Sequence, residues 1–219
     1  MKVILKPAGV LVVFGAFGVL AFVALPKKVT PPEVAPSSAP SNESPVASAS
    51  AAGGGPELST RSSGKVNWSK AKQILKPDIT GPNWRMLVGK GKMENTVVPS
   101  SIAGHQFARR LTIGTLGSNS WDLQIAHPLE VAFKKGTHVR LTYWGRSKDS
   151  CTLAAVVEQA GDPYTKITSR TAKLTPEWKQ YSEEWEQTAD TEPGWAHINF
   201  QVGYQVGELE LTGVELDAL

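Results

Sequence analysis

One stretch of the chain places an aromatic ring and a guanidinium group on the same side of a predicted strand. The apolar residues Val139, Leu141 and Tyr143 alternate there with polar residues that include Trp144 and Arg146. A period of two is typical of a β-strand with one buried face, so the indole and the guanidinium are expected on the other face. A flat ring beside a planar set of hydrogen-bond donors suits a ring-shaped ligand rich in hydroxyl groups.

The same alternation recurs in two further predicted strands, whose outward positions hold amide side chains. These are Gln124 in the first strand and Asn199 and Gln201 in the second. An amide both donates and accepts hydrogen bonds, as a hydroxyl group requires of its partner. We expect these amides and the guanidinium of Arg146 to converge along a single trough.

Two more aromatic residues, Tyr164 and Trp195, begin strands next to predicted turns, where a ring can line the edge of a groove. Trp121 is a further candidate for stacking, but it has the spacing of a core residue, so the rim of the core is an alternative place for it. The complete set of predicted binding residues is Trp144, Arg146, Gln124, Gln201, Asn199, Trp121, Tyr164 and Trp195.

The residue pattern gives little indication of a catalytic site or a metal site. Cleavage of a glycosidic bond needs two carboxylates about 5–9.5 Å apart, and no motif pairs Asp122, Glu158, Glu183 or Glu184. The chain contains no nucleophile elbow, no phosphate-binding loop and no zinc-protease motif, and its four histidines lack metal-ligand spacing. We therefore predict a protein that is not an enzyme and that holds no metal.

The charge of the chain argues against nucleic-acid binding. Residues 65–219 hold 18 Lys and Arg and 17 Asp and Glu, a net charge of +1, and the remaining +2 lies in residues 1–64. A basic surface is the usual requirement for binding the phosphate backbone. No nucleic-acid partner is predicted, and the sequence gives no oligomeric state.

The N-terminal quarter of the chain has a different composition. Residues 8–25 form an uninterrupted apolar run, which as a helix would rise about 27 Å and just span a bilayer core of about 30 Å. We predict a membrane anchor in residues 1–28, with a cleaved signal peptide as the alternative. Residues 29–64, rich in Pro, Ser, Ala and Gly, are predicted to be a disordered linker. Both alternatives place the rest of the chain outside the cytoplasm, in the cell membrane or secreted.

Residues 65–219 are predicted to form an all-β domain. Short apolar-patterned segments follow one another between turn sequences, and no segment has a long 3.6-residue apolar period. The strands are expected at residues 84–88, 93–98, 107–115, 120–125, 129–133, 137–147, 152–159, 164–173, 178–188, 195–202 and 208–216. This number of strands favours a two-sheet antiparallel jelly-roll sandwich.

The ordered set of segments resembles a CenC-type carbohydrate-binding module, a jelly roll of the galactose-binding-like group. The matching pieces include Ser-Trp-Asp-Leu-Gln-Ile at 120–125, Leu-Thr-Tyr-Trp-Gly-Arg at 141–146, Leu-Thr-Pro-Glu-Trp-Lys-Gln-Tyr at 174–181 and Phe-Gln-Val-Gly at 200–203. A further piece, Gly-Glu-Leu-Glu-Leu-Thr-Gly-Val-Glu-Leu, occupies residues 207–216, and the resemblance covers residues 74–216.

The resemblance implies non-catalytic binding of a polysaccharide or oligosaccharide. Members of the group often hold a structural calcium with an acidic residue in the final strand, where this chain has Thr212 and Gly213. This departure argues against a calcium site, and no cofactor is predicted. We therefore expect a tethered module that retains sugar chains at the cell surface. A structural or protein-interaction sandwich of the envelope, or an accessory part of a glycoside hydrolase system, is the alternative.

Overall fold

Two antiparallel β-sheets make up the part of the chain that the structure describes. This computed structural model describes residues 59–60, 65–76 and 78–219, which all belong to one compact unit, Ala51–Leu219. The predicted membrane anchor at 1–28 and almost all of the predicted linker at 29–64 lie outside the described residues. In the described part of the chain, no helix is both long enough and apolar enough to cross a membrane.

The larger sheet has seven strands in the order β1-β10-β7-β12-β5-β4, with β2 paired to β12 beside this path. Its strands are β1 (Ser59–Thr60), β2 (Lys72–Leu75), β4 (Lys92–Ile102), β5 (His105–Thr115), β7 (His138–Arg146), β10 (Lys179–Gln187) and β12 (Gly207–Ala218). A 3₁₀ turn, η1 (Trp68–Lys70), precedes β2. The long β12 pairs with β5 through its first half and with β2 through its last residues, and therefore ties the sheet together.

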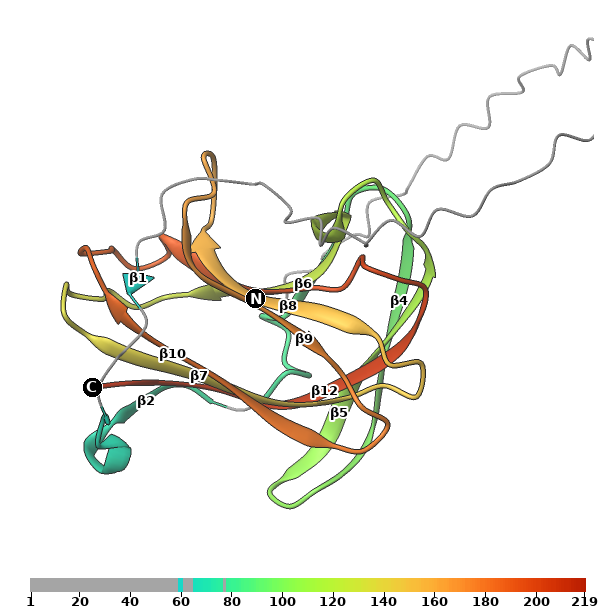
Figure 1. The fold of residues 1–219 in the computed structure, drawn as a ribbon, viewed down its shortest axis with the longest axis horizontal. Coiled ribbons are helices and arrows are strands. Elements are labelled where there is room, and N and C mark those ends of the chain that lie inside the picture. Colours follow the sequence, from blue (N-terminus) through green and yellow to red (C-terminus); the bar gives the residue numbers. More distant parts are fainter. Residues whose placement is uncertain (1–58, 61–64, 77) are drawn as a thin grey trace, which may run out of the picture. The chain divides into compact units, whose positions relative to one another are not determined.

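The smaller sheet has five strands in the order β3-β6-β11-β8-β9. They are β3 (Arg85–Val88), β6 (Leu123–Leu129), β8 (Thr152–Gln159), β9 (Lys166–Lys173) and β11 (Ala196–Gln201). Figure 1 shows β6, β8 and β9 in one layer of the sandwich and β10, β7 and β12 in the other. The predicted all-β sandwich of two antiparallel sheets is thus confirmed.

The alternating sequence pattern decides which side chains fill the space between the sheets. In β7, Leu141 is fully buried and Tyr143 nearly so, whereas their neighbours are only half-buried. The other sheet contributes Ile125 and Phe200, which are also fully buried. Since successive side chains of a strand point to opposite faces, the half-buried neighbours of these residues on β7 lie on the outer surface of their sheet.

Two predicted strands take a different form. Residues 120–122 form a 3₁₀ turn, η2 (Ser120–Asp122), because the Oδ2 atom of Asp122 accepts hydrogen bonds from the backbone N–H groups of Ser118 (2.7 Å) and Asn119 (3.0 Å). Such local side-chain bonds compete with strand pairing. The predicted strand at 129–133 is also absent, since the Phe133 N–H donates to the Thr191 side chain and forms only an isolated bridge.

Candidate functional site

A groove of about 780 Å³ lies on the outer surface of the five-stranded sheet. Its walls and floor include Gln124 of β6, Gln201 and His197 of β11, and Glu158 of β8. These side chains share one face because Leu123, Ile125, Ile198, Phe200 and Val157, their neighbours along the strands, fill the core.

The strand register arranges the polar side chains of the groove in two rows. Gln124 stands opposite Gln201 in one row, and Glu158 lies between His197 and Lys166 in the other. Gln201 and His197 are four residues apart on β11, which separates the rows by about 13 Å at about 3.3 Å per residue.

The row between these two is mainly apolar. Ala126 and Val156 flank Asn199 there, and all three side chains are buried. These three residues do not line the groove, which therefore offers hydrogen-bonding groups toward both ends.

One exposed aromatic side chain lies near each polar row. Trp121, on η2, is 44% exposed, and its turn contacts the Gln201 end of β11, where Ser120 Oγ lies 3.4 Å from Gln201 Oε1. A Cβ atom on Gly203 would lie 2.7 Å from the Ser120 carbonyl oxygen, so glycine is what allows this close approach.

Tyr164 stands beyond the other row, in the loop that follows β8. Its side chain is 55% exposed, although its backbone adopts a positive φ of 56°, which is unusual for a bulky residue. A hydrogen bond of 2.7 Å from the Tyr164 N–H to the Gly161 carbonyl oxygen holds this turn. The fold thus holds an aromatic ring in solvent at the end of the groove, an arrangement typical of a binding surface.

Buried polar groups beneath the groove form a connected set. Asn199 Nδ2 donates to Glu158 Oε1 at 2.6 Å and also lies 2.6 Å from His197 Nε2. Two buried acceptors, Gln124 Oε1 and Asn199 Oδ1, have no partner within the described residues. Such unpaired buried groups cost stability.

Four of the eight predicted binding residues line the groove: Trp121, Gln124, Tyr164 and Gln201. Asn199 is fully buried, and its Nδ2 atom donates a hydrogen bond to Glu158 Oε1. Trp195 packs partly buried against the core, and its carbonyl oxygen accepts a hydrogen bond from the backbone of Ala160. The roles of these six residues in binding remain predictions.

Trp144 and Arg146 do not join this groove, so the expected single trough is wrong. Both residues lie on β7, which pairs with β10 and β12 in the seven-stranded sheet, and they point to the outer surface of that sheet. Gln124 and Gln201 point outward from the opposite sheet. The period-two pattern gave the correct face within each strand, but it carries no information about which of the two sheets a strand joins.

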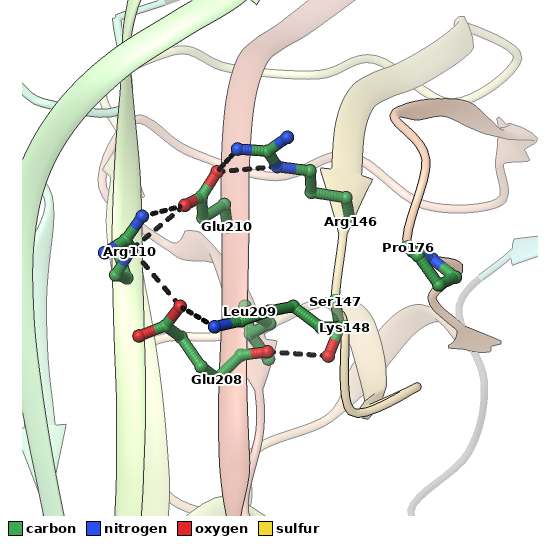
Figure 2. Close-up of a pocket in the computed structure, with 8 residues that line it drawn as sticks. All are labelled: Arg110, Arg146, Ser147, Lys148, Pro176, Glu208, Leu209 and Glu210. Carbon is green, nitrogen blue, oxygen red and sulfur yellow. Dashed lines mark hydrogen bonds and ion pairs between the residues drawn. The ribbon is translucent and has the colours of Figure 1, made fainter.

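Figure 2 shows that Arg146 belongs to a network of ion pairs beside a smaller pocket of about 230 Å³. Its Nε and Nη2 atoms lie 2.8 and 2.7 Å from Glu210 Oε2, and Arg110 Nη2 lies 2.6 Å from Glu210 Oε1. The hydrogen bond to Glu210 raises the pKa of Arg110. The Arg146 guanidinium also stacks 4.8 Å from the centre of the Trp178 ring. These contacts link β5, β12 and β7, so the structure gives Arg146 a stabilising role.

The sequence analysis did not select Glu158, His197 and Lys166 as groove residues. Glu158 entered only as a possible catalytic carboxylate. The outward position of His197, opposite that of Ile198, was predicted, but His197 was not included among the binding residues. The position of Lys166 in the groove could not be predicted from the sequence, because a register shift between Val157 and Glu158 changes the pairing of β8 with β9.

Glu158 is the one carboxylate among the described residues that line the groove. Asp122 uses its Oδ2 atom to cap η2, and Glu183 is buried, where Thr168 Oγ1 donates to it at 2.7 Å. The arrangement therefore offers hydrogen bonds and aromatic surfaces but not the pair of carboxylates that glycoside cleavage needs.

Comparison with known proteins agrees with this geometry. A family model described as a carbohydrate binding domain matches residues 71–203, more than half of the chain. The solved structure named "CBM4 structure and function" is similar over 68% of this chain and 95% of its own, with a TM-score of 0.52 and 16% identity. At that identity the similarity shows the shared fold alone.

Two further solved modules cover the same 68% of the chain, each with a TM-score of 0.48. They are the N-terminal cellulose-binding domain of Cellulomonas fimi β-1,4-glucanase C, at 23% identity over 98% of its chain, and the CBM22-1 xylan-binding domain of Paenibacillus barcinonensis Xyn10C, at 12% identity over 95% of its chain. No curated protein matches. Because the family model spans most of the domain, the chain belongs to the carbohydrate binding domain family, as its resemblance to CenC-type modules predicted.

Proposed function

We propose that this protein binds a polysaccharide or oligosaccharide, without cleaving it, in the groove on the five-stranded sheet. The observation that carries the proposal is the meeting of two exposed aromatic rings, Trp121 and Tyr164, with two outward amides, Gln124 and Gln201, around one groove. An aromatic ring offers a flat apolar face for the C–H groups of a sugar ring, and amides match its hydroxyl groups.

The volume of the groove lies within the range of about 300–1,000 Å³ typical of small-ligand sites, so a short stretch of a sugar chain suits it.

The absence of a second carboxylate in the groove supports binding without catalysis. Glycoside hydrolases use two carboxyl groups about 5–9.5 Å apart, and Glu158 is alone among the described residues of the groove. A bound chain is therefore expected to remain intact.

Affinity electrophoresis of the full chain tests the proposal. Gels containing hydroxyethyl cellulose, xylan, mixed-linkage β-glucan, galactan or starch are compared with a gel without polysaccharide. We expect retardation in at least one of them and no release of reducing ends from that glycan. Equal migration in every gel would contradict binding, and newly formed reducing ends would contradict the absence of catalysis.

We also propose that the protein is tethered at the cell envelope and retains sugar chains there. The apolar run at 8–25, with Lys2 and Lys6 before it and Lys27 and Lys28 after it, supports a membrane anchor. Cell fractionation tests this part: we expect the intact chain in the membrane fraction and its extraction only by detergent. A shortened chain in the medium would support the cleaved-signal alternative, and a cytoplasmic protein would contradict both.

A further inference from the structure

Glu158 is the one carboxylate of the groove among the described residues, and neither a lysine nor an arginine pairs with it there. Glu158 is only 6% exposed. His197 stands opposite it on β11 and Lys166 on β9. Among the residues that line the groove, these three side chains are the ionisable ones that face each other from neighbouring strands.

Neither neighbour makes a short contact with the carboxylate. His197 Nε2 lies 3.4 Å from Glu158 Oε1 and closer to Asn199 Nδ2, at 2.6 Å. Lys166 is half-buried, and its ammonium group stands at the end of a long side chain. No ion pair joins this group to Glu158 in the described part of the chain. Water and salt screen such an ammonium more strongly than they screen the buried carboxylate.

The carboxylate is held in a fixed orientation. Asn199, which is fully buried, donates to Oε1 at 2.6 Å and anchors one oxygen to the floor. The other oxygen, Oε2, accepts no hydrogen bond from the described residues, and Glu158 lines the groove. A carboxylate can only accept hydrogen bonds, so Oε2 presents a fixed, charged acceptor to whatever occupies this end of the groove.

We infer that Glu158 is a specificity-determining residue that makes the groove select neutral sugars and reject sugars that carry a carboxylate. This inference rests on the proposed function of the groove. Ring hydroxyls of a neutral sugar donate to Oε2 in a charge-assisted hydrogen bond. A uronic acid in the same position brings a second anion, which only accepts, against a poorly solvated carboxylate, and like charges in such surroundings repel strongly. The amides at the other end of the groove carry no charge and do not discriminate in this way.

A matched pair of ligands tests the inference on the full chain. The neutral member is an oligosaccharide of the glycan that retards the protein most strongly in the electrophoresis panel. The acidic member has the same backbone and linkage, with a carboxylate on C5 of each ring. Isothermal titration is expected to give at least about tenfold weaker binding of the acidic member to the natural chain.

Glu158→Gln is the decisive variant, because glutamine keeps the acceptor that Asn199 needs and removes the charge. We expect it to weaken binding of the neutral member, because the hydrogen bond to Oε2 is no longer charge-assisted, and to reduce the difference between the two ligands to less than about threefold. The control is Glu94→Gln, which makes the same change of charge on exposed β4 of the opposite sheet and is expected to keep the tenfold difference. Thermal unfolding midpoints establish that both variants fold, and Glu158→Ala serves as a second charge-removing variant.

The outcomes separate this inference from the proposed function. Equal binding of both ligands by the natural chain, or a difference that persists in Glu158→Gln and Glu158→Ala, would overturn the role of Glu158 while leaving sugar binding intact. Failure of the natural chain to bind any neutral glycan of the panel would overturn the proposed function, and the specificity inference with it.

Discussion

Replacing Trp121 with alanine should weaken glycan binding about tenfold, whereas the same replacement at Trp144 should leave it unchanged. The two indoles stand on the outer surfaces of opposite sheets, Trp121 beside the groove and Trp144 on β7. The sequence alone favoured Trp144 over Trp121, so the pair tests the placement of the site directly.

The expected magnitude follows from the exposed area of the indole. A tryptophan side chain has an area of about 250 Å², and 44% exposure leaves about 110 Å² of Trp121 in solvent. A sugar ring that covers one face removes about half of this area from water. At about 25 cal/mol per Å² the contribution is about 1.4 kcal/mol, which is a tenfold change in dissociation constant.

Affinity electrophoresis over a series of polysaccharide concentrations gives the dissociation constants of the natural chain and the two variants. Thermal unfolding midpoints show whether each variant remains folded at the assay temperature. A loss of binding in Trp144→Ala together with natural affinity in Trp121→Ala would refute the reasoning and move the site to the seven-stranded sheet.

Three further predictions concern stability and reactivity. Phe200 is fully buried and packs against Tyr143, with ring centres 5.0 Å apart. Phe200→Ala should therefore lower the free energy of unfolding by about 3–5 kcal/mol in denaturant titrations. An unchanged unfolding midpoint would contradict the placement of Phe200 in the core. Burial lowers the pKa of His127, so the unfolded chain takes up a proton at this residue more readily than the folded chain. The free energy of unfolding should therefore fall as the pH drops below about 6.5, and His127→Asn should make this fall less steep. An equal slope of stability against pH in both proteins would argue against this role of His127. Cys151 is 1% exposed, and burial raises the pKa of its thiol. A thiol reagent at pH 8 should therefore modify the folded chain far more slowly than the denatured chain. Equal rates of modification would contradict the burial of Cys151.

Local sequence pattern was sufficient to predict most of the fold. Alternation along residues 138–146 identified β7 and its buried face, because one side of that strand must be apolar to fill the core. The turn at 120–122 was harder to predict, since its form depends on side-chain bonds from Asp122 to the backbone rather than on hydrophobic pattern.

The binding surface could be predicted only in part, because it depends on how distant strands pair. Gln124 and Gln201 share a row since β6 and β11 are neighbours in one sheet, and Arg146 is excluded since β7 pairs elsewhere. The alternation within each strand would be the same whether β7 joined the sheet of β6 and β11 or the other sheet. Glu158 was overlooked as a groove residue because its importance comes from Asn199, 41 positions away in the chain.

The central claim is that sugar binds on the five-stranded sheet, and an NMR titration tests it most directly. The indole N–H signals of Trp121 and Trp144 report on the two outer surfaces in a single spectrum. As a retarding oligosaccharide is added, the account predicts a saturable shift of the Trp121 signal and of the Gln124 and Gln201 side-chain amides, with the Trp144 signal unmoved. A saturable shift at Trp144 with Trp121 unmoved would contradict it.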